Sequence, residues 1–262
     1  MRSKRVVFMI FVSLVAIVGG GVVGMRTGRG KVAQTLELKP GIYGVKTGGG
    51  IYIYGARAGQ NLILFDSGTD PQARPIDKLL NALAGSRPDV HDIFLTHGHF
   101  DHISGAVSFA GSNVRTHLGA ADVELAAETV APDAIATKVL TLVMSPGPLK
   151  VTDLLTGPAT IPVGEGKMVK AVPVPGHTPG SYAFLYEGVF FAGDIMIVKE
   201  GRLETTPALF DAHPEENRAA IRSLKTQLVA DTIETVCTSH GGCTPRGLGR
   251  NLLDDLIARV GG

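Results

Sequence analysis

The chain has 262 residues, 44% of them apolar and 19% charged, so it is long and apolar enough to bury a sizeable core and is not a disordered chain. The formal net charge is +1, but residues 1–31 carry six basic and no acidic side chains, which leaves 19 basic against 24 acidic groups in residues 32–262. A net charge of −5 there argues against a nucleic-acid partner. Cys237 and Cys243 are too few for a disulfide scaffold or a four-cysteine zinc ribbon.

The N-terminal segment has the pattern of a membrane anchor. From Val6 to Met25 there are 20 residues without a charge, enough for a helix that spans a bilayer core. Basic residues precede this stretch, so the positive-inside rule places the N-terminus in the cytoplasm and the following domain outside it. The alternative is a cleaved signal peptide, which would leave the domain secreted or periplasmic. We favour an anchor at residues 1–31, followed by a folded domain at residues 32–262.

Beyond Lys31 the apolar pattern changes its period every dozen residues or so, which is typical of an α/β chain. In chain order, strands are predicted at 42–46, 51–54, 62–66, 92–96, 169–174, 182–186, 189–192 and 235–238. Helices are predicted at 75–83, 214–228 and 248–260, the second with Asp211 among the acidic residues at its start. Residues 128–150 break the pattern and are either a substrate-covering loop or a poorly packed connection.

Potential metal ligands follow the strand at 92–96 directly, in the segment His97-Gly98-His99-Phe100-Asp101-His102. A strand that ends in such a loop can direct these side chains into one cleft. A single histidine is more often structural than a ligand, but four ligand groups within six residues favour a metal site. Imidazole and carboxylate together suit zinc, with iron and manganese as alternatives.

Further ligand types stand at the ends of other predicted strands. They occur in Pro175-Gly176-His177-Thr178-Pro179-Gly180-Ser181, Phe191-Ala192-Gly193-Asp194 and Ser239-His240-Gly241. Taken in order, the motifs His-x-His-x-Asp-His, Gly-His-Thr-x-Gly-Ser, Gly-Asp and Ser-His-Gly resemble those of the metallo-β-lactamase superfamily over roughly residues 40–245. Asp66 stands where the family's first motif has an aspartate that supports the histidine loop.

This resemblance implies an α/β fold, a four-layer αββα sandwich with a two-metal site along one edge. It implies that one metal ion binds His97, His99 and His177, that the other binds Asp101, His102 and His240, and that Asp194 bridges both. Two divalent ions, zinc before iron or manganese, would share a hydroxide at neutral pH, because they lower the pKa of water from about 15.7 toward 7. Asp101 is then also the catalytic residue that orients the nucleophile.

The remaining candidate ligands match no family position. His91, His117 and His213 are predicted to be structural. Cys237 and Cys243 flank His240, and we expect either a buried thiol or, if the domain is exported, a local disulfide.

Differences between this sequence and the motifs of individual subfamilies narrow the range of reactions that it could catalyse. Members that hydrolyse β-lactams typically have Cys or Ser in place of Asp194, and acyl-homoserine lactonases have Tyr in place of Ile197. Glyoxalase II looks similar around Phe191–Asp194, but it adds a C-terminal helical domain that binds glutathione, and only 22 residues follow His240 here. We therefore predict hydrolysis of a thioester or ester of a small molecule. Hydrolysis of a lactone is the second choice, and hydrolysis of a β-lactam is the third.

Another class of reaction is that of the persulfide dioxygenases, relatives that use one iron ion and consume oxygen. Their ligands correspond to His97, His177 and Asp194. A single metal ion per chain would distinguish this reaction from hydrolysis. The sequence predicts no oligomeric state.

Overall fold

The computed structural model describes residues 35–47, 50–141, 144–145 and 147–261. Its first sheet has the strand order β1-β2-β3-β4-β5-β6-β7. Neighbours from β1 to β4 are antiparallel, and those from β4 to β7 are parallel. The strands are β1 Thr35–Lys39, β2 Ile42–Lys46, β3 Tyr52–Ala58, β4 Asn61–Phe65, β5 Val90–Phe94, β6 Arg115–Gly119 and β7 Asp153–Leu155.

The second sheet has the order β15-β14-β11-β10-β9-β8, and a separate hairpin pairs β12 with β13. Among the described residues of this sheet, β11 and β14 pair in parallel and the other neighbouring strands pair antiparallel. The strands are β8 Ala159–Gly164, β9 Lys167–Pro173, β10 Tyr182–Tyr186, β11 Val189–Gly193, β12 Met196–Lys199, β13 Arg202–Thr205, β14 Thr235–Thr238 and β15 Gly242–Cys243.

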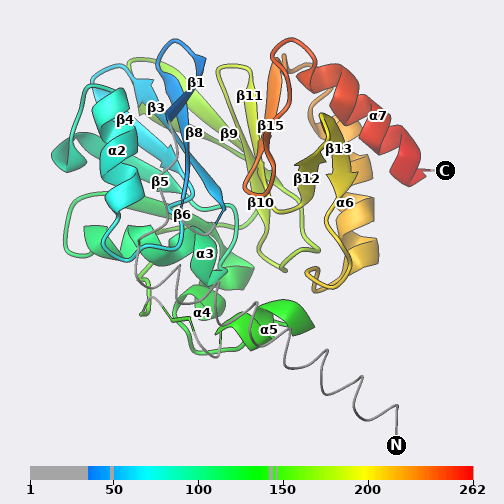
Figure 1. Cartoon of the computed structure of the whole chain (residues 1–262), viewed down its shortest axis with the longest axis horizontal. Coiled ribbons are helices and arrows are strands. Elements are labelled where there is room, and N and C mark those ends of the chain that lie inside the picture. The colour runs from blue at the N-terminus through cyan, green and yellow to red at the C-terminus, as the bar shows by residue number, and fades with distance from the viewer. Residues whose placement is uncertain (1–34, 48–49, 142–143, 146, 262) are drawn as a thin grey trace, which may run out of the picture.

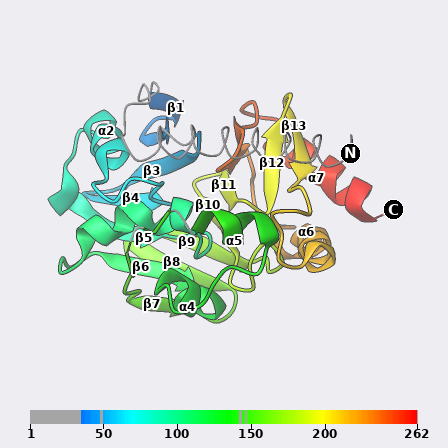
Figure 2. The same cartoon turned by 60° about the horizontal axis from the view of Figure 1, so that its bottom comes forward.

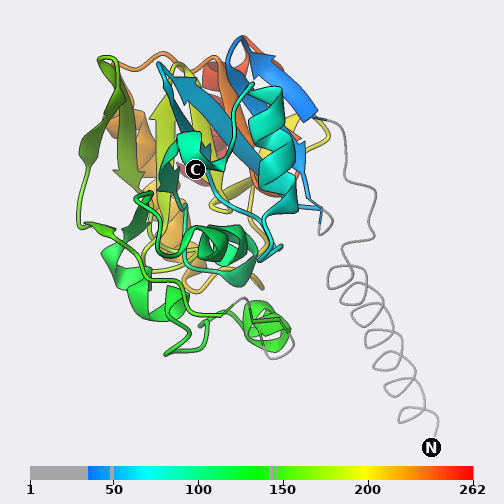
Figure 3. The same ribbon diagram turned by 90° about the vertical axis from the view of Figure 1, so that its left-hand side faces the viewer.

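Helices cover the outer faces of both sheets (Figure 1). Helix α2 packs on β2 and β3 of the first sheet, and Figure 3 shows it lying across these strands. On the other side, α7 packs on β14 and α6 packs on α7. The helices are α2 Arg74–Ala82, α3 Phe100–Ile103, α4 Val123–Ala126, α5 Ile135–Thr141, α6 Pro214–Gln227 and α7 Gly249–Gly261, with short 3-10 turns η1 Arg87–Asp89, η2 Ser104–Phe109 and η3 Ala120–Asp122.

Buried side chains fill the three spaces between these layers. Between the sheets the core is aromatic, and the rings of Phe65 and Phe191 stack with centroids 3.8 Å apart. Aliphatic side chains fill the space under α2 and the space under α6 and α7. Full burial of each large apolar side chain contributes about 1.5–3 kcal/mol, so the sandwich is held mainly by these three clusters. The predicted αββα arrangement is therefore the one observed.

The predicted strands and helices are present, with ends shifted by a few residues, and β3 is longer because it pairs along both β2 and β4. Asp211 is a correction, because α6 begins at Pro214 after the cap residue His213 and the carboxylate of Asp211 is used elsewhere. The predicted insertion at 128–150 contains α5. Figure 2, with that end of the molecule turned forward, shows α5 in front of the strands.

The predicted anchor or signal segment at residues 1–31 lies outside the described residues. Within the described part, no helix combines the length and the apolar character needed to cross a bilayer.

Candidate active site

All seven predicted ligands meet at one edge of the sandwich, where strands of both sheets end. His97 and His99 follow β5, and Asp101 and His102 lie on α3. The remaining ligands come from the second sheet: His177 lies between β9 and β10, Asp194 directly follows β11, and His240 lies in the turn between β14 and β15. Chain segments that are far apart in the sequence thus place imidazoles and carboxylates around one small volume.

The first group consists of His97, His99 and His177, all of them buried. His99 Nδ1 lies 2.9 Å from His97 Nε2 and 3.2 Å from His177 Nε2. Nitrogen ligands at about 2.0–2.1 Å from a tetrahedral zinc ion are roughly 3.3 Å apart. The three nitrogen atoms therefore face a common point at a spacing that suits a metal ion.

The second group consists of Asp101, His102 and His240. Asp101 Oδ2 lies 3.8 Å from the Nε2 atoms of both histidines. His102 is fully buried, whereas the ring of His240 is 45% exposed, so this group faces solvent on one side. An open side is the feature that separates a catalytic metal site from a closed structural one.

Asp194 lies between the two groups. Its Oδ2 atom is 3.8 Å from Nε2 of His177 in the first group, and 3.4 Å and 3.2 Å from Nε2 of His102 and His240 in the second. The preceding residue, Gly193, has φ +56°, a backbone conformation that favours glycine. It also lies against the side chain of Thr96, so that a Cβ atom at this position would be only 2.5 Å from the Thr96 hydroxyl. Glycine before Asp194 thus lets the end of β11 approach the histidine loop.

The donor set fits divalent metal ions. Asp101 Oδ1, His102 Nε2 and Asp194 Oδ1 are buried and have no hydrogen-bond partner among the described residues, a costly arrangement unless a ligand completes it. Burial and the neighbouring histidine rings hold the pKa of both His97 and His99 well below the usual range, which leaves them neutral with a lone pair free for a metal.

Charges around the shared carboxylate also favour metal binding. Burial opposes ionisation of Asp194, but His102 and His240 hold the pKa of its carboxyl well below its usual value. Burial would lower the pKa of His102, yet the carboxylates of Asp194, Asp66 and Asp101 raise it well above its usual value. Asp194 likewise raises the pKa of His240. The second group therefore concentrates negative charge, and a cation held there would compete with the protons that these carboxylates favour on His102 and His240.

Asp66 has the supporting role that the family motif predicts. Its Oδ2 atom is 2.9 Å from His102 Nδ1, and its Oδ1 atom accepts a hydrogen bond of 2.8 Å from the backbone N–H of Thr96. Ser239, next to His240, donates its hydroxyl to the same carboxylate at 3.1 Å. One buried acid therefore orients ligand-bearing segments from both sheets.

Two further acids were not predicted to belong to the site. Asp211 Oδ1 is 3.0 Å from His177 Nδ1, which leaves Nε2 of that ring facing His99. Asp122 accepts hydrogen bonds from the backbone N–H of Gly98 at 2.8 Å and from the hydroxyl of Thr178 at 2.6 Å. It thereby joins the loop of His97 and His99 to the loop of His177.

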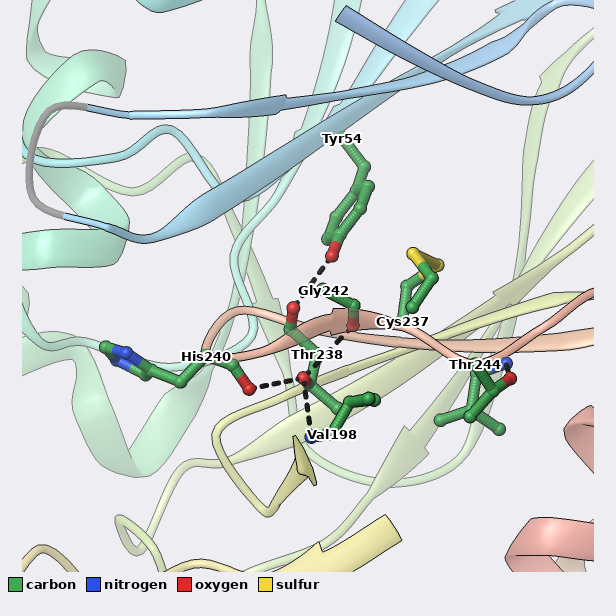
Figure 4. The surroundings of a disulfide bond; sticks show 9 residues. Tyr54, Val198, Cys237, Thr238, His240, Gly242 and Thr244 are labelled. Carbon is green, nitrogen blue, oxygen red and sulfur yellow. Dashed lines mark hydrogen bonds between the residues drawn. A yellow bond between two sulfur atoms is a disulfide. The ribbon is translucent and has the colours of Figure 1, made fainter. Parts of the chain in front are cut away.

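His240 is positioned mainly by the backbone of its own turn (Figure 4). Among the described residues no hydrogen bond orients its exposed ring from the Nδ1 side. The turn is held instead by the hydroxyl of Thr238, which donates to the carbonyl of His240 at 2.7 Å, and by Tyr54, whose hydroxyl donates to the carbonyl of Thr238 at 2.7 Å. The disulfide between Cys237 and Cys243 closes the base of the turn, so the predicted alternative of a local disulfide is the one observed.

A cavity of about 270 Å³ opens beside the ligands. His99, Asp101, His177, Asp194 and His240 form its floor, while its other walls come from α3, α5, β12 and residues 206–210.

Of the histidines predicted to be structural, His117 is buried and bonds Asp92 at 2.7 Å, and none of the three joins a metal-ligand group in the described chain.

The sequence model of the metallo-beta-lactamase superfamily matches residues 47–240. The chain belongs to this superfamily. With its histidine and aspartate groups suited to divalent metal ions, it is a metallo-hydrolase. No curated protein matches the chain.

Solved structures with the same fold include a metallo-β-lactamase of Cronobacter sakazakii described by its HARLDQ motif, with a TM-score of 0.64 and 20% identity over 90% of this chain and 94% of that one. The subclass B3 enzyme BJP-1 of Bradyrhizobium japonicum gives a TM-score of 0.61 and 23% identity over 81% and 80%. An enzyme of Pontibacter korlensis gives 0.64 and 16% identity over 87% and 99%. At these identities the likeness is one of fold.

Proposed function

We propose that this metallo-hydrolase holds two divalent metal ions and cleaves a thioester or ester of a small molecule. Zinc is the first choice for the metal, and iron and manganese are the alternatives. The observation that carries the proposal is the position of Asp194, one oxygen of which lies within 3.2–3.8 Å of ligand nitrogens from both groups. A shared carboxylate is the feature expected when two ions act on one substrate bond.

The residues have distinct roles in this proposal. His97, His99 and His177 would hold one ion and Asp101, His102 and His240 the other, with Asp194 placed between the two groups. When bound, the pair supplies Lewis acidity and lowers the pKa of water enough for attack at neutral pH. Asp101 orients the attacking water through Oδ1, which is buried and unpaired in the described chain. Asp66 and Asp211 keep two of the rings in position.

Residues near the shared carboxylate favour an ester or thioester over other substrates. Ile197 lines the cavity where lactonases of this superfamily have a tyrosine, so no phenol is available there to assist lactone opening. The second candidate is β-lactam hydrolysis, because the structural neighbours reported above are β-lactamases by title. Asp194, in the place of the Cys or Ser typical of those enzymes, argues against it. The complete second group argues against a persulfide dioxygenase, which needs only one ion.

The test combines metal analysis with a substrate panel. The purified protein, loaded with zinc, iron or manganese, is expected to bind two ions per chain and to hydrolyse thioesters or esters faster than lactones and β-lactams. Replacing His177 by Ala should empty the first group, and Asp101→Asn should lower kcat far more than it changes KM. A single iron per chain together with oxygen uptake on a persulfide would overturn the proposal, as would undiminished turnover in Asp101→Asn.

We also propose that the catalytic domain works outside the cytoplasm, tethered by the N-terminal segment. The uncharged stretch from Val6 to Met25 after Arg2, Lys4 and Arg5 supports this, and so does the disulfide, because such bonds persist mainly in oxidising compartments.

A further inference from the structure

We propose that the substrate carries an uncharged, apolar acyl group, and that this group occupies the cavity beside the ligands, which we call the acyl pocket. This inference rests on the proposed ester or thioester hydrolysis and names the acyl part of its substrate. Five side chains form the apolar walls of the acyl pocket: Phe100, Leu140, Ile197, Pro207 and Phe210.

The chemistry of the lining selects against charged acyl groups. Apart from the ligands, the polar side chains that line the acyl pocket are those of Thr137 and Thr206, and no Lys or Arg lines it in the described chain. An ionised carboxylate that leaves water for the apolar walls, away from the metal ligands, has no Lys or Arg side chain among the described lining residues to pair with, and its desolvation is costly. The pocket therefore suits a neutral acyl group better than one that ends in a carboxylate.

The apolar wall is fixed relative to the ligands. At one end of the segment 206–211, the hydroxyl of Thr206 donates to the backbone carbonyl of Asp194. At the other end, Asp211 bonds His177 at 3.0 Å. Between them, the N–H of Phe210 donates to the carbonyl of Pro207 at 2.9 Å. This segment, which carries Pro207 and Phe210, is thus attached to the backbone of Asp194 and, through Asp211, to His177 of the first group, so these two walls of the pocket are held beside the ligands.

The size of the pocket limits the acyl group. Its volume of about 270 Å³ lies just below the usual range of roughly 300–1,000 Å³ for small-molecule sites. A short to medium acyl chain fits such a space, whereas a long chain must extend beyond it; Phe210, one of its walls, is 38% exposed.

The experiment uses p-nitrophenyl esters and N-acetylcysteamine thioesters of acetic, butyric, hexanoic and octanoic acid, together with adipic half-esters that end in a carboxylate. We expect kcat/KM to rise with each added methylene group by up to about fourfold, the rate equivalent of about 0.8 kcal/mol, and to level off once the pocket is full. The adipic half-ester should react at least tenfold more slowly than the hexanoic ester of equal length.

Two variants with the same added charge test the wall itself. Phe210→Lys places a cation on the pocket and is expected to lower the rate with the hexanoic ester while raising that with the adipic half-ester. Leu209→Lys is the matched control, because Leu209 is 57% exposed and is not among the described residues that line the acyl pocket. It should leave the ratio of the two rates unchanged. Metal content, measured for both variants, shows whether the ligands stay in place.

The outcomes separate this inference from the function on which it rests. No hydrolysis of any ester or thioester by the metal-loaded enzyme would overturn the proposed function. Clear hydrolysis with rates independent of acyl length, or an adipic half-ester as fast as the hexanoic ester, would overturn the acyl pocket alone. Equal effects of Phe210→Lys and Leu209→Lys on the rate ratio would also overturn it.

Discussion

Removing the Cys237–Cys243 disulfide is expected to weaken both the fold and the second metal-ligand group. The two cysteines lie opposite each other on β14 and β15, six positions apart, and the bond closes a loop of seven residues. The chain-entropy relation for a loop of this length gives about 2.4 kcal/mol of stabilisation. For a domain of this size, each kcal/mol shifts Tm by about 2–4 °C, so a loss of roughly 5–10 °C is expected.

The local effect concerns His240, which stands midway in the closed loop. Its ring is 45% exposed and has no hydrogen bond on its Nδ1 side within the described residues, whereas the Nδ1 atoms of the buried rings of His102 and His177 are held by Asp66 and Asp211. A looser turn therefore moves His240 more than the other ligands. We expect the weaker of the two metal affinities to fall by about tenfold or more, the usual size of an orienting-group effect, while the stronger changes little.

The assay compares parent protein with the double variant Cys237→Ala/Cys243→Ser, each with and without a phosphine reductant. Calorimetric unfolding gives Tm, and native mass spectrometry at limiting zinc gives the number of bound ions per chain. The reductant should act on the parent as the double substitution does, and it should have no effect on the variant. If the variant keeps the parental Tm and binds two ions at the parental zinc concentrations, the disulfide neither stabilises the domain nor positions His240.

Three buried acids give further predictions. Asp211→Ala should lower zinc affinity by about 10–100-fold in a calorimetric titration, since His177 loses its orienting partner; an unchanged affinity would mean that packing alone holds the ring. Asp122→Ala leaves two buried backbone N–H groups unpaired and should cost about 2–4 kcal/mol in urea unfolding; a loss below about 1 kcal/mol would contradict this. Burial opposes ionisation of Asp92, but His117 and Arg115 lower its pKa, so its contribution is present above the unfolded value of about 3.9 and lost as pH falls through the folded one. The stability difference between parent and Asp92→Asn should therefore be full near pH 7 and shrink below about pH 4, and a difference that is constant with pH would refute the linkage.

The ligands could be predicted from the sequence because each follows an element with a strong local pattern. Alternating or continuous apolar runs mark β5, β11 and β14, and the motif residues stand directly after them. A residue that directly follows a strand in the sequence must lie at the end of that strand in the fold, so the place of these motif residues could be predicted once the strands were. The more exposed strand β8 at the edge of the second sheet and the separate β12–β13 hairpin were not predicted.

Two supporting residues, Asp122 and Asp211, could not be predicted, because their partners are distant in the sequence. Asp211 stands shortly before Pro214, which is typical of a helix start, yet its carboxylate reaches His177, 34 positions away. Asp122 reaches Gly98 and Thr178, 24 and 56 positions away. The walls of the acyl pocket are likewise assembled from four separate segments. These long-range contacts depend on how the two sheets pack together, and the local periodicity of the sequence does not predict that packing.

The disulfide also bears on where the enzyme works, and this leads to a last prediction. Disulfide bonds persist mainly in oxidising compartments, so the bond between Cys237 and Cys243 agrees with the proposal that the domain works outside the cytoplasm. In intact cells whose thiols are blocked with maleimide before lysis, we expect neither cysteine to be labelled. Protease added after permeabilisation of the outer layer should digest the domain while a cytoplasmic control survives, and alkaline carbonate should leave the full-length chain in the membrane pellet. Full protection of the domain together with two labelled cysteines would refute an exported domain, and a soluble product that starts near residue 25 would show a cleaved signal in place of an anchor.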